Sequence, residues 1–484
     1  MSFSLPLQLT IVFIANTIYN LYLHPLRHYP GPRLYAASHL PYTINWINGS
    51  LLNEISVLHT QYGPVVRVAP NRLSYTDPSA WHSIRGHRKA GEGENGKEFS
   101  FYASAINNIL GASRSSHSRF RRLLANGFST KSMQLQQPLI TGYVDLLLER
   151  LKGKEVVDIV SWFNYTTFDI IGDLSFGQPF GCLERSETHP WVEIIFASVG
   201  QFGVVVSMRR HVPFVLSFIR TVFPGSIGKP IVEQAKYARR QVDKRLESGG
   251  ERRDFIDSMV KTSGDKELLT REEIAENARM LVLAGSETTA TALSGTVYLL
   301  AKHKEVQKKL AEEVRREFKT EEDIDLFSVQ RLGYMLAVLD ESMRVIPPVP
   351  SSLPRVCQRG GDVIAGKWVP EGTGLDIFPT AMFRSEDNFI DADKFLPERW
   401  FEDKSRDKRF AKDKRDAFEP FSVGPRNCIG KNLAYVEMRL IMARLMWNFD
   451  FEFADEEAVG WLARCKGFNL WYKGPLNIRL LKRT

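Results

Sequence analysis

Cysteine is scarce in this chain. The 484 residues include four cysteines, which are scattered and form no Cys-x-x-Cys pair: Cys182, Cys357, Cys428 and Cys465. This pattern excludes a disulfide scaffold, a zinc ribbon and a dithiol redox pair. The chain also lacks internal repeats, low-complexity segments and breaks in composition, so nothing marks a second domain. Its 43% of hydrophobic and 25% of charged residues indicate a globular protein with a substantial core.

Segregated charge is absent as well. The 64 Lys and Arg residues exceed the 56 Asp and Glu residues and give a net charge of +8. Opposite charges nevertheless alternate along the chain, as in 304–318 and 402–416. Such interleaving is typical of a solvated surface, so we expect no nucleic acid as a partner. The positive excess suits a face that receives an acidic protein.

The first 23 residues contain no charged side chain. A helix of about 20 residues spans the hydrocarbon of a bilayer, and this segment lacks the basic start and the cleavage site of a signal peptide. The alternative is a tilted or partly interfacial helix, because Asn16 and Asn20 lower the hydropathy. The basic residues that follow are Arg27, His28 and Arg33, and they predict that the body of the protein lies in the cytoplasm.

Beyond this segment the pattern is mainly helical, with small extended regions. β-Branched and aromatic runs in 64–77 predict a hairpin, and 361–378 predicts a further small strand region. Apolar periodicity from Thr270 to about Leu300 predicts a helix of about 30 residues, which Thr270 and Glu273 begin with capping-box spacing. We therefore predict a mainly α fold with small β-sheets and one long helix through its middle.

That long helix carries polar residues at its centre. The stretch LVLAGSETTATAL, at 281–293, places Gly285 and several hydroxyl and carboxyl side chains in an apolar surrounding. Glycine in a helix costs about 1 kcal/mol relative to alanine, and hydroxyls can bend a helix. The stretch predicts a polar groove at a functional site; the alternative is a polar patch on a solvent face.

A second unusual stretch is FSVGPRNCIGKNLAYVEMRL, at 421–440. A basic residue precedes Cys428, and an amphipathic helix follows it at once. A positive charge, a helix N-terminus or a metal stabilises a thiolate. The last histidine, His303, leaves no local base for a nucleophilic cysteine. A metal thiolate without a neighbouring ligand indicates a macrocycle that supplies the other ligands. The alternative is a small buried hydrophobe.

Together AGSETT, ESMR (341–344), FLPERW (395–400) and FSVGPRNCIG resemble, in order and separation, the four motifs of the cytochrome P450 superfamily of haem-thiolate monooxygenases. The resemblance covers essentially the whole chain. The pattern Phe-x-x-Gly-x-Arg-x-Cys-x-Gly is met at every fixed position, by Phe421, Gly424, Arg426, Cys428 and Gly430. The N-terminal segment with HPLRHYPGP, and HSRFRRLLANGFS at 117–129, are similar to membrane-bound fungal enzymes of secondary metabolism that act on terpenoids and polyketides.

The resemblance implies roles for the residues around the cofactor. Cys428 is the implied axial thiolate ligand of haem b, iron protoporphyrin IX, with Phe421 packed near the sulfur and the loop glycines letting backbone N–H groups approach it. The implied contacts of the haem propionates are Arg426, Arg121, Arg355 and His117, of which His117 stands where many members have tryptophan. The implied buried ion network that braces the loop consists of Glu341, Arg344 and Arg399.

The resemblance also implies the distal side. Ala284 and Gly285 make room for O2, while Thr288, backed by Glu287 as a carboxylate connected to solvent, delivers protons. Members that isomerise or dehydrate without oxygen often lose this pair, so its presence favours monooxygenation. By position, the pocket residues are Phe101, Phe202 and Phe468 as walls and Ser351 and Ser352 as hydrogen-bond donors, which fits a lipophilic, modestly oxygenated substrate.

We therefore predict a monooxygenase that inserts one oxygen atom from O2 into a lipophilic small molecule, by hydroxylation or epoxidation, in fungal secondary metabolism. No dinucleotide fingerprint follows a strand, so electrons from NADPH must arrive through a separate NADPH-cytochrome P450 reductase near Cys428. The predicted segments are a transmembrane anchor over 1–23, a proline-rich linker over 24–35 and a cytoplasmic catalytic domain over 36–484, in a single-pass endoplasmic reticulum protein. The alternatives are a haem-thiolate isomerase or multistep ring-forming oxidase, and a non-catalytic, membrane-tethered haem- or ligand-binding protein.

Overall fold

Helices make up most of the fold. The structure is a computed structural model that describes residues 5–89, 91–211, 213–222, 229–249, 252, 254–260, 269–402 and 406–483. The helices of the first part are α1 (Leu5–Ile18), α2 (Arg33–Ala37), α3 (Leu40–Asn48), α4 (Leu51–Tyr62), α5 (Ser79–Arg85), α6 (Phe99–Tyr102), α7 (Arg114–Ala125), α8 (Thr130–Leu151), α9 (Ile159–Phe176) and α10 (Cys182–Arg185). Those that follow are α11 (Pro190–His211), α12 (Pro213–Val222), α13 (Lys229–Glu247), α14 (Phe255–Val260), α15 (Arg271–Lys302), α16 (Lys304–Glu317), α17 (Gly333–Val345), α18 (Pro379–Phe383), α19 (Lys431–Asn448), α20 (Glu456–Val459) and α21 (Trp461–Arg464).

The strands form small sheets. They are β1 (Val65–Ala69), β2 (Arg72–Tyr75), β3 (Gly96–Lys97), β4 (Val156–Asp158), β5 (Arg355–Val356), β6 (Asp362–Ile364), β7 (Lys367–Val369), β8 (Gly374–Asp376), β9 (Phe449–Phe453), β10 (Lys466–Gly467), β11 (Trp471–Tyr472) and β12 (Asn477–Lys482). The largest sheet has the order β1-β2-β8-β5-β3, another has the order β4-β12-β9, and β6–β7 and β10–β11 pair as separate ribbons. The hairpin predicted in 64–77 is confirmed as antiparallel β1–β2, and the strand region of 361–378 as β6, β7 and β8.

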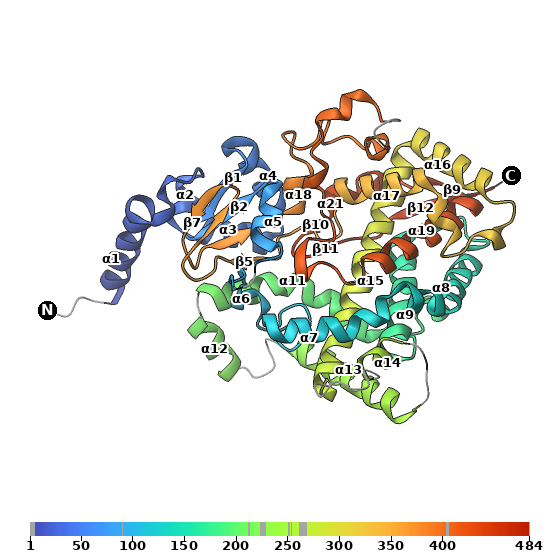
Figure 1. The fold of residues 1–484 in the computed structure, drawn as a ribbon, viewed down its shortest axis with the longest axis horizontal. Helices are drawn as coiled ribbons and strands as arrows, with labels where there is room; N and C mark the ends of the chain where they lie inside the picture. Colours follow the sequence, from blue (N-terminus) through green and yellow to red (C-terminus); the bar gives the residue numbers. More distant parts are fainter. Residues whose placement is uncertain are drawn as a thin grey trace.

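The long central helix is confirmed as α15. Its 32 residues correspond to a length of about 48 Å. Thr270 accepts a hydrogen bond from the N–H of Glu273, and the Glu273 carboxylate accepts one from the N–H of Thr270, so the predicted capping box is formed. The helix packs against α9, α13, α17 and α19. Figure 1 shows α15 running through the middle of the molecule, where it can carry side chains into the interior.

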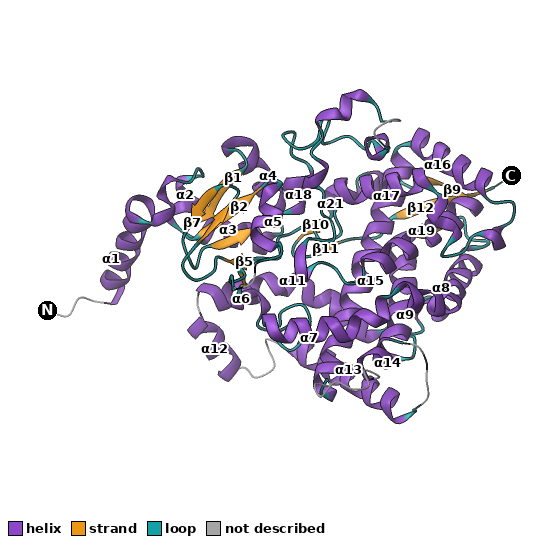
Figure 2. Cartoon of the chain, viewed as in Figure 1, coloured by secondary structure: helices purple, strands orange, loops and turns teal. Residues whose placement is uncertain are grey.

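The sheets and the helices occupy different regions. The core around β1, β2 and β8 contains Leu73, Tyr75 and Leu375, whereas a larger core unites α8, α9, α15, α17 and α19. Figure 2 shows the largest sheet toward the end of the molecule that carries α1, and the large helices toward the other end. The segments that build the candidate site come from both regions.

The N-terminal segment is helical from Leu5 to Leu23. A π-helical turn, Tyr19–Leu23, continues α1 directly, and Asn20 donates a hydrogen bond to the carbonyl of Ala37, 2.9 Å away. Apolar side chains of α1 are exposed, among them Val12 and Phe13. In the described part of the chain we find no helix long and apolar enough to cross a membrane. Residues 1–4 of the predicted anchor lie outside the described residues.

Candidate active site

A cavity of about 460 Å³ lies between α15 and the loop that precedes α19. This volume falls in the range of small-molecule sites, about 300–1,000 Å³. Its walls also include residues of α6, α7, α9, α11 and α13, and they are largely apolar. Because the lining residues are spread from Trp81 to Leu470, the cavity is formed by segments from most of the chain.

Cys428 lines this cavity from the end of a tightly turned loop. The Cys428 N–H donates to the carbonyl of Phe421, 2.9 Å away. Gly424 has φ +77°, and a Cβ there would lie 2.0 Å from the carbonyl oxygen of Arg85. The turn therefore requires glycine for both backbone conformation and space. Phe421 packs against Tyr435 of α19, with ring centroids 5.0 Å apart and the rings tilted by 48°.

Groups around the Cys428 sulfur shift the pKa of its thiol in opposite directions. Its side chain is exposed, but to the cavity rather than to the outside. Burial raises the pKa of the Cys428 thiol, while a hydrogen bond from the Gly430 backbone and the charges of Arg121 and Lys431 lower it. The helix α19 begins at Lys431, so the positive end of its dipole is also close. These groups can stabilise a thiolate once a metal ion offers it a bond.

A cluster of basic side chains lines the same cavity. Its members are Arg426, Arg121, Arg355, His117 and, in addition to the predicted residues, Lys97 and Arg85. Arg426 forms an ion pair with Glu94 at 2.7 Å, and Arg121 donates to the carbonyl of Asn427 at 2.6 Å. Arg355 donates to the carbonyl of Asn95, and its Nε has no hydrogen-bond partner among the described residues.

This cluster fits the two carboxylates of a haem. Burial lowers the pKa of Lys97 well below its usual range, and the charges of Arg355, Arg426 and Arg85 add to the effect. Burial likewise lowers the pKa of His117 to about 4. Buried cations that depress one another in this way are stabilised by an anion. Glu437 of α19 also lines the cavity, but burial raises its pKa to about 8, so this carboxyl is largely neutral at pH 7. No sequence motif marked Lys97 or Glu437.

The wall formed by α15 contains Ala284, Gly285 and Thr288. The Thr288 hydroxyl donates to the carbonyl of Ala284, one turn earlier. A Cβ on Gly285 would lie 2.8 Å from Cδ1 of Ile171 on α9. Glycine at this position therefore permits α15 to pack closely on α9, while the Gly285 backbone remains part of the cavity wall.

Glu287 differs from the prediction. It is 2% exposed, so it has no direct contact with solvent, and it is absent from the described cavity wall. Successive residues of a helix point about 100° apart, so Glu287 faces away from the cavity that Thr288 lines. Its carboxylate pairs instead with Lys473, a residue that sequence reasoning missed.

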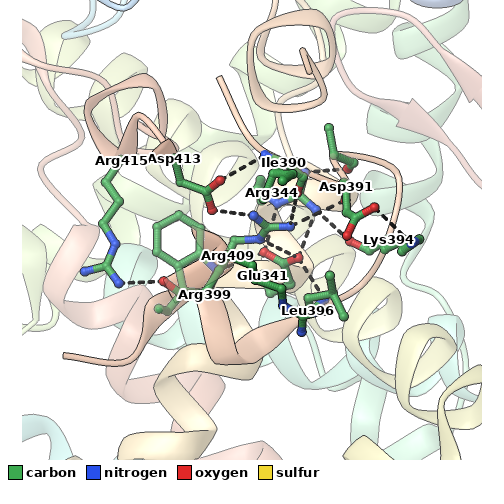
Figure 3. A network of polar contacts seen from close by, with 12 residues as sticks. Glu341, Arg344, Ile390, Asp391, Lys394, Leu396, Arg399, Arg409, Asp413 and Arg415 are labelled. Atoms are coloured by element: carbon green, nitrogen blue, oxygen red, sulfur yellow. Dashed lines mark hydrogen bonds and ion pairs between the residues drawn. The ribbon is translucent and has the colours of Figure 1, made fainter. Parts of the chain in front are cut away.

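The ion network is centred on Glu341, whose carboxylate binds both Arg344 and Arg399 (Figure 3). The Nε atoms of the two arginines lie 2.8 and 3.1 Å from Glu341 oxygens, and these side chains are at most 1% exposed. Arg399 also pairs with Asp413, so two cations meet two anions. Trp400 donates to Glu341 at 2.9 Å and packs on Phe418, at the start of the cysteine loop. Asp413 corrects the interpretation of 402–416 as a solvated surface, because its side chain is 1% exposed.

The predicted substrate contacts divide into two groups. Phe101, Phe202 and Ser351 line the cavity, and the two phenylalanine rings meet edge to face at 5.0 Å. Ser352 and Phe468 are corrected, since neither belongs to the described lining. The Ser352 hydroxyl accepts a hydrogen bond from the backbone N–H of Ile377. Phe468 packs toward Gly49, because the turn between β10 and β11 directs Asn469 and Leu470 into the cavity instead. Sequence reasoning also missed Gln234 and Arg279.

Comparisons with known proteins agree with this geometry. The family described as cytochrome P450 matches residues 30–461. An averantin hydroxylase of Dothistroma septosporum is 44% identical over 479 residues, which cover 97% of this chain and 89% of that protein. The cytochrome P450 monooxygenase aclL of Aspergillus oryzae is 44% identical, with 98% and 96% covered. A trichothecene C-15 hydroxylase of Fusarium sporotrichioides is 42% identical, with 97% and 96% covered.

Proposed function

This chain belongs to the cytochrome P450 family and is a monooxygenase, and from this premise we propose that it hydroxylates or epoxidises a lipophilic secondary metabolite of a fungus. The observation that carries the proposal is that Cys428 and Thr288, from segments 140 positions apart in the sequence, line one apolar cavity. When bound, the haem supplies the activation of O2, which a thiolate ligand promotes. The test is the conversion of a candidate metabolite with NADPH, O2 and a reductase.

The chain's own residues have distinct tasks in this proposal. Cys428 is the thiolate ligand, and the Gly430 N–H bond to its sulfur tunes the charge on that ligand. Arg121, Arg355, Arg426, His117 and Lys97 hold the propionates, as their shared cavity wall supports. Phe101 and Phe202 exclude water and contact the substrate's apolar surface. Ser351 and Asn469, which also line the cavity, provide hydrogen bonds that orient it.

The substrate class rests on the cavity and on the relatives. The walls are mostly apolar, with a few polar side chains, which suits a lipophilic molecule that carries some oxygen atoms. Two relatives are named for the hydroxylation of averantin and of trichothecenes. We therefore choose averantin and a trichothecene as the first candidate substrates.

Thr288→Ala tests proton handling at the α15 wall. The hydroxyl lies on the cavity surface, where it can pass protons to oxygen, and alanine cannot do so. We expect the variant to retain its haem and to consume NADPH, but to convert a smaller share of it into hydroxylated product and a larger share into hydrogen peroxide. Product and peroxide are measured per NADPH. An unchanged product yield would contradict the role of Thr288, and Thr296→Ala, a buried threonine two turns further along α15, is the matched control.

The electron donor in this proposal is NADPH-cytochrome P450 reductase. Lys431 is exposed at the start of α19, next to the cysteine loop, and the chain carries a net charge of +8. A positive surface at the shortest route to Cys428 suits an acidic partner, whose association would weaken with salt.

The membrane attachment in this proposal is a single N-terminal anchor in the endoplasmic reticulum, with residues 36–484 in the cytoplasm. It is supported by exposed apolar side chains of α1, and of α12, where Phe214 is 86% and Phe218 is 64% exposed. Figure 1 shows α1 and α12 toward the same end of the molecule. An exposed apolar helix face is stabilised in the interface of a bilayer.

Deleting residues 1–23 and replacing Phe214 and Phe218 with aspartate tests this attachment. We expect the deletion to release part of the protein from membranes, and the deletion combined with both aspartates to release nearly all of it. Flotation with lipid vesicles measures the bound fraction. The matched control is Val459→Asp in the deletion variant, because Val459 is 53% exposed on the distant α20. Equal binding of all three deletion variants would contradict a role for α12.

A further inference from the structure

A buried ion pair lies directly behind the wall that carries Thr288. Lys473 pairs with the Oε1 atom of Glu287, and the two side chains are 4% and 2% exposed. The ammonium also donates to the hydroxyl of Thr291, 2.8 Å away, and that hydroxyl is 3.4 Å from Glu287 Oε1. The three groups thus form a closed polar cluster against one side of α15.

In the described part of the chain, Lys473 is the cation that pairs with Glu287. The second carboxylate oxygen, Oε2, is buried and has no hydrogen-bond partner within the described part of the chain. A buried carboxylate whose cation is removed is left uncompensated, which is unfavourable, so it is expected to move toward another polar partner. The ammonium of Lys473 therefore holds the carboxylate in its present position.

Lys473 comes from a segment that also touches the cavity. It directly follows β11, and the residues before that strand, Asn469 and Leu470, line the cavity. Trp471 donates to the carbonyl of Pro347 at 2.8 Å, and Pro347 is itself part of the wall. The backbone around Lys473 lies at the surface, where Tyr472 and Gly474 are exposed, while its side chain points inward. The ammonium consequently stands between solvent and Glu287.

We propose that Lys473 is a positioning residue for proton delivery at Thr288: its ammonium holds the Glu287 carboxylate beside Thr291 and so sets the carboxylate's access to Thr288. This inference rests on the proposed monooxygenase function. Glu287 precedes Thr288 in the helix but faces away from the cavity, so proton transfer between them requires a defined carboxylate position. Asn469 and Leu470 belong to the same segment as Lys473 and line the cavity. A substrate that contacts them would therefore also affect the position of the Glu287 carboxylate.

Electron counting without substrate provides a readout that needs no identified ligand. An O2 molecule that takes two electrons and two protons leaves as hydrogen peroxide, with one NADPH consumed. An O2 molecule that takes four electrons and four protons leaves as two water molecules, with two NADPH consumed. Poor proton delivery favours the first outcome, so peroxide formed per NADPH reports on the relay.

The experiment compares full-length holoenzymes with reductase, NADPH and O2. In Lys473→Met we expect peroxide per NADPH to rise toward its limit of one, while Lys473→Arg keeps the wild-type value because it keeps the cation. In the Glu287→Gln background, Lys473→Met should add no further change, since the carboxylate it positions is gone. Lys466→Met, at an exposed lysine of β10, is the matched control and should behave as wild type.

Thermal unfolding of the same variants is a second readout. We expect Lys473→Met to lower the unfolding midpoint and the double variant to recover part of that loss, because removing both charges leaves none uncompensated. If Lys473→Met does not fold, peroxide per NADPH is compared between Glu287→Gln and the double variant. Equal values support the proposal, and different values contradict it. Unchanged peroxide yield in Lys473→Met, or an equal change with and without Glu287, would overturn the proposal. A wild-type protein that binds no haem and consumes no NADPH would instead overturn the proposed function.

Discussion

Replacing Cys428 with alanine is expected to abolish the red-shifted Soret band of the reduced carbon monoxide complex and all NADPH-dependent product formation. Cys428 lines the cavity just before α19, where burial raises the pKa of its thiol and the Gly430 N–H, Arg121 and Lys431 partly offset that rise. Alanine removes the bond to iron and the electron density that the sulfur contributes to O2 activation. Absorption spectra of the purified protein, reduced with dithionite under carbon monoxide, provide the measurement.

The matched controls for this variant are Cys357→Ala and Cys465→Ala. Burial raises the pKa of each of these thiols to about 11, so both are protonated at neutral pH. Neither belongs to the described lining of the cavity. Both control variants should keep the band and the activity. A Cys428→Ala protein that still shows the band would prove the ligand assignment wrong.

Among the substitutions proposed for this protein, replacing Glu341 with glutamine is expected to lower the free energy of unfolding most. Glu341 is fully buried and compensates Arg344 and Arg399, so glutamine leaves an excess of buried positive charge. Breaking a buried ion network in this way costs about 3–5 kcal/mol. We expect a lower midpoint of urea unfolding and a smaller fraction of protein with bound haem, because Trp400 connects the network to Phe418 beside the cysteine loop.

Arg384→Ala provides the contrast. Arg384 pairs with Asp393, but the two side chains are 40% and 74% exposed. Exposed pairs contribute about 0–1 kcal/mol, so this variant should unfold close to wild type. If Glu341→Gln and Arg384→Ala shifted the unfolding midpoint equally, the central place of Glu341 in the network would be wrong.

Local patterns predicted the elements whose signals lie within a few residues. The capping box at Thr270 and Glu273 and the periodicity after it located the start and the course of α15. The fixed spacing around Cys428 likewise identified the loop, because Gly424 and Gly430 meet steric and hydrogen-bonding needs within the loop's own surroundings. Short-range rules are sufficient where the physical requirement is itself short-range.

Residues that act across the fold could not be found in this way. Lys97, Lys473 and Asp413 have no local motif, and Asp413 lies in a stretch of alternating charge that is typical of surfaces. Their roles depend on partners far away in the sequence: Glu287 lies 186 residues before Lys473. Ser352 and Phe468 show the opposite error, since their position along the chain was correct but their side chains point elsewhere. Which way a loop directs each side chain is decided by tertiary packing.

The strand β12 is synthesised near the end of the chain but pairs with β4, which is synthesised much earlier. The backbone N–H of its neighbour Leu476 donates a hydrogen bond to the carboxylate of Asp158, 318 residues earlier, and β12 itself joins β4 to β9. At about 5–20 residues per second, a ribosome needs about 16 to 64 s to travel between these two points. The edge of β4 therefore remains unpaired while α9, α15 and the cysteine loop emerge from the ribosome. Nascent chains should depend on chaperones during that interval, and a stop codon a few residues early would leave an otherwise finished body with an open sheet.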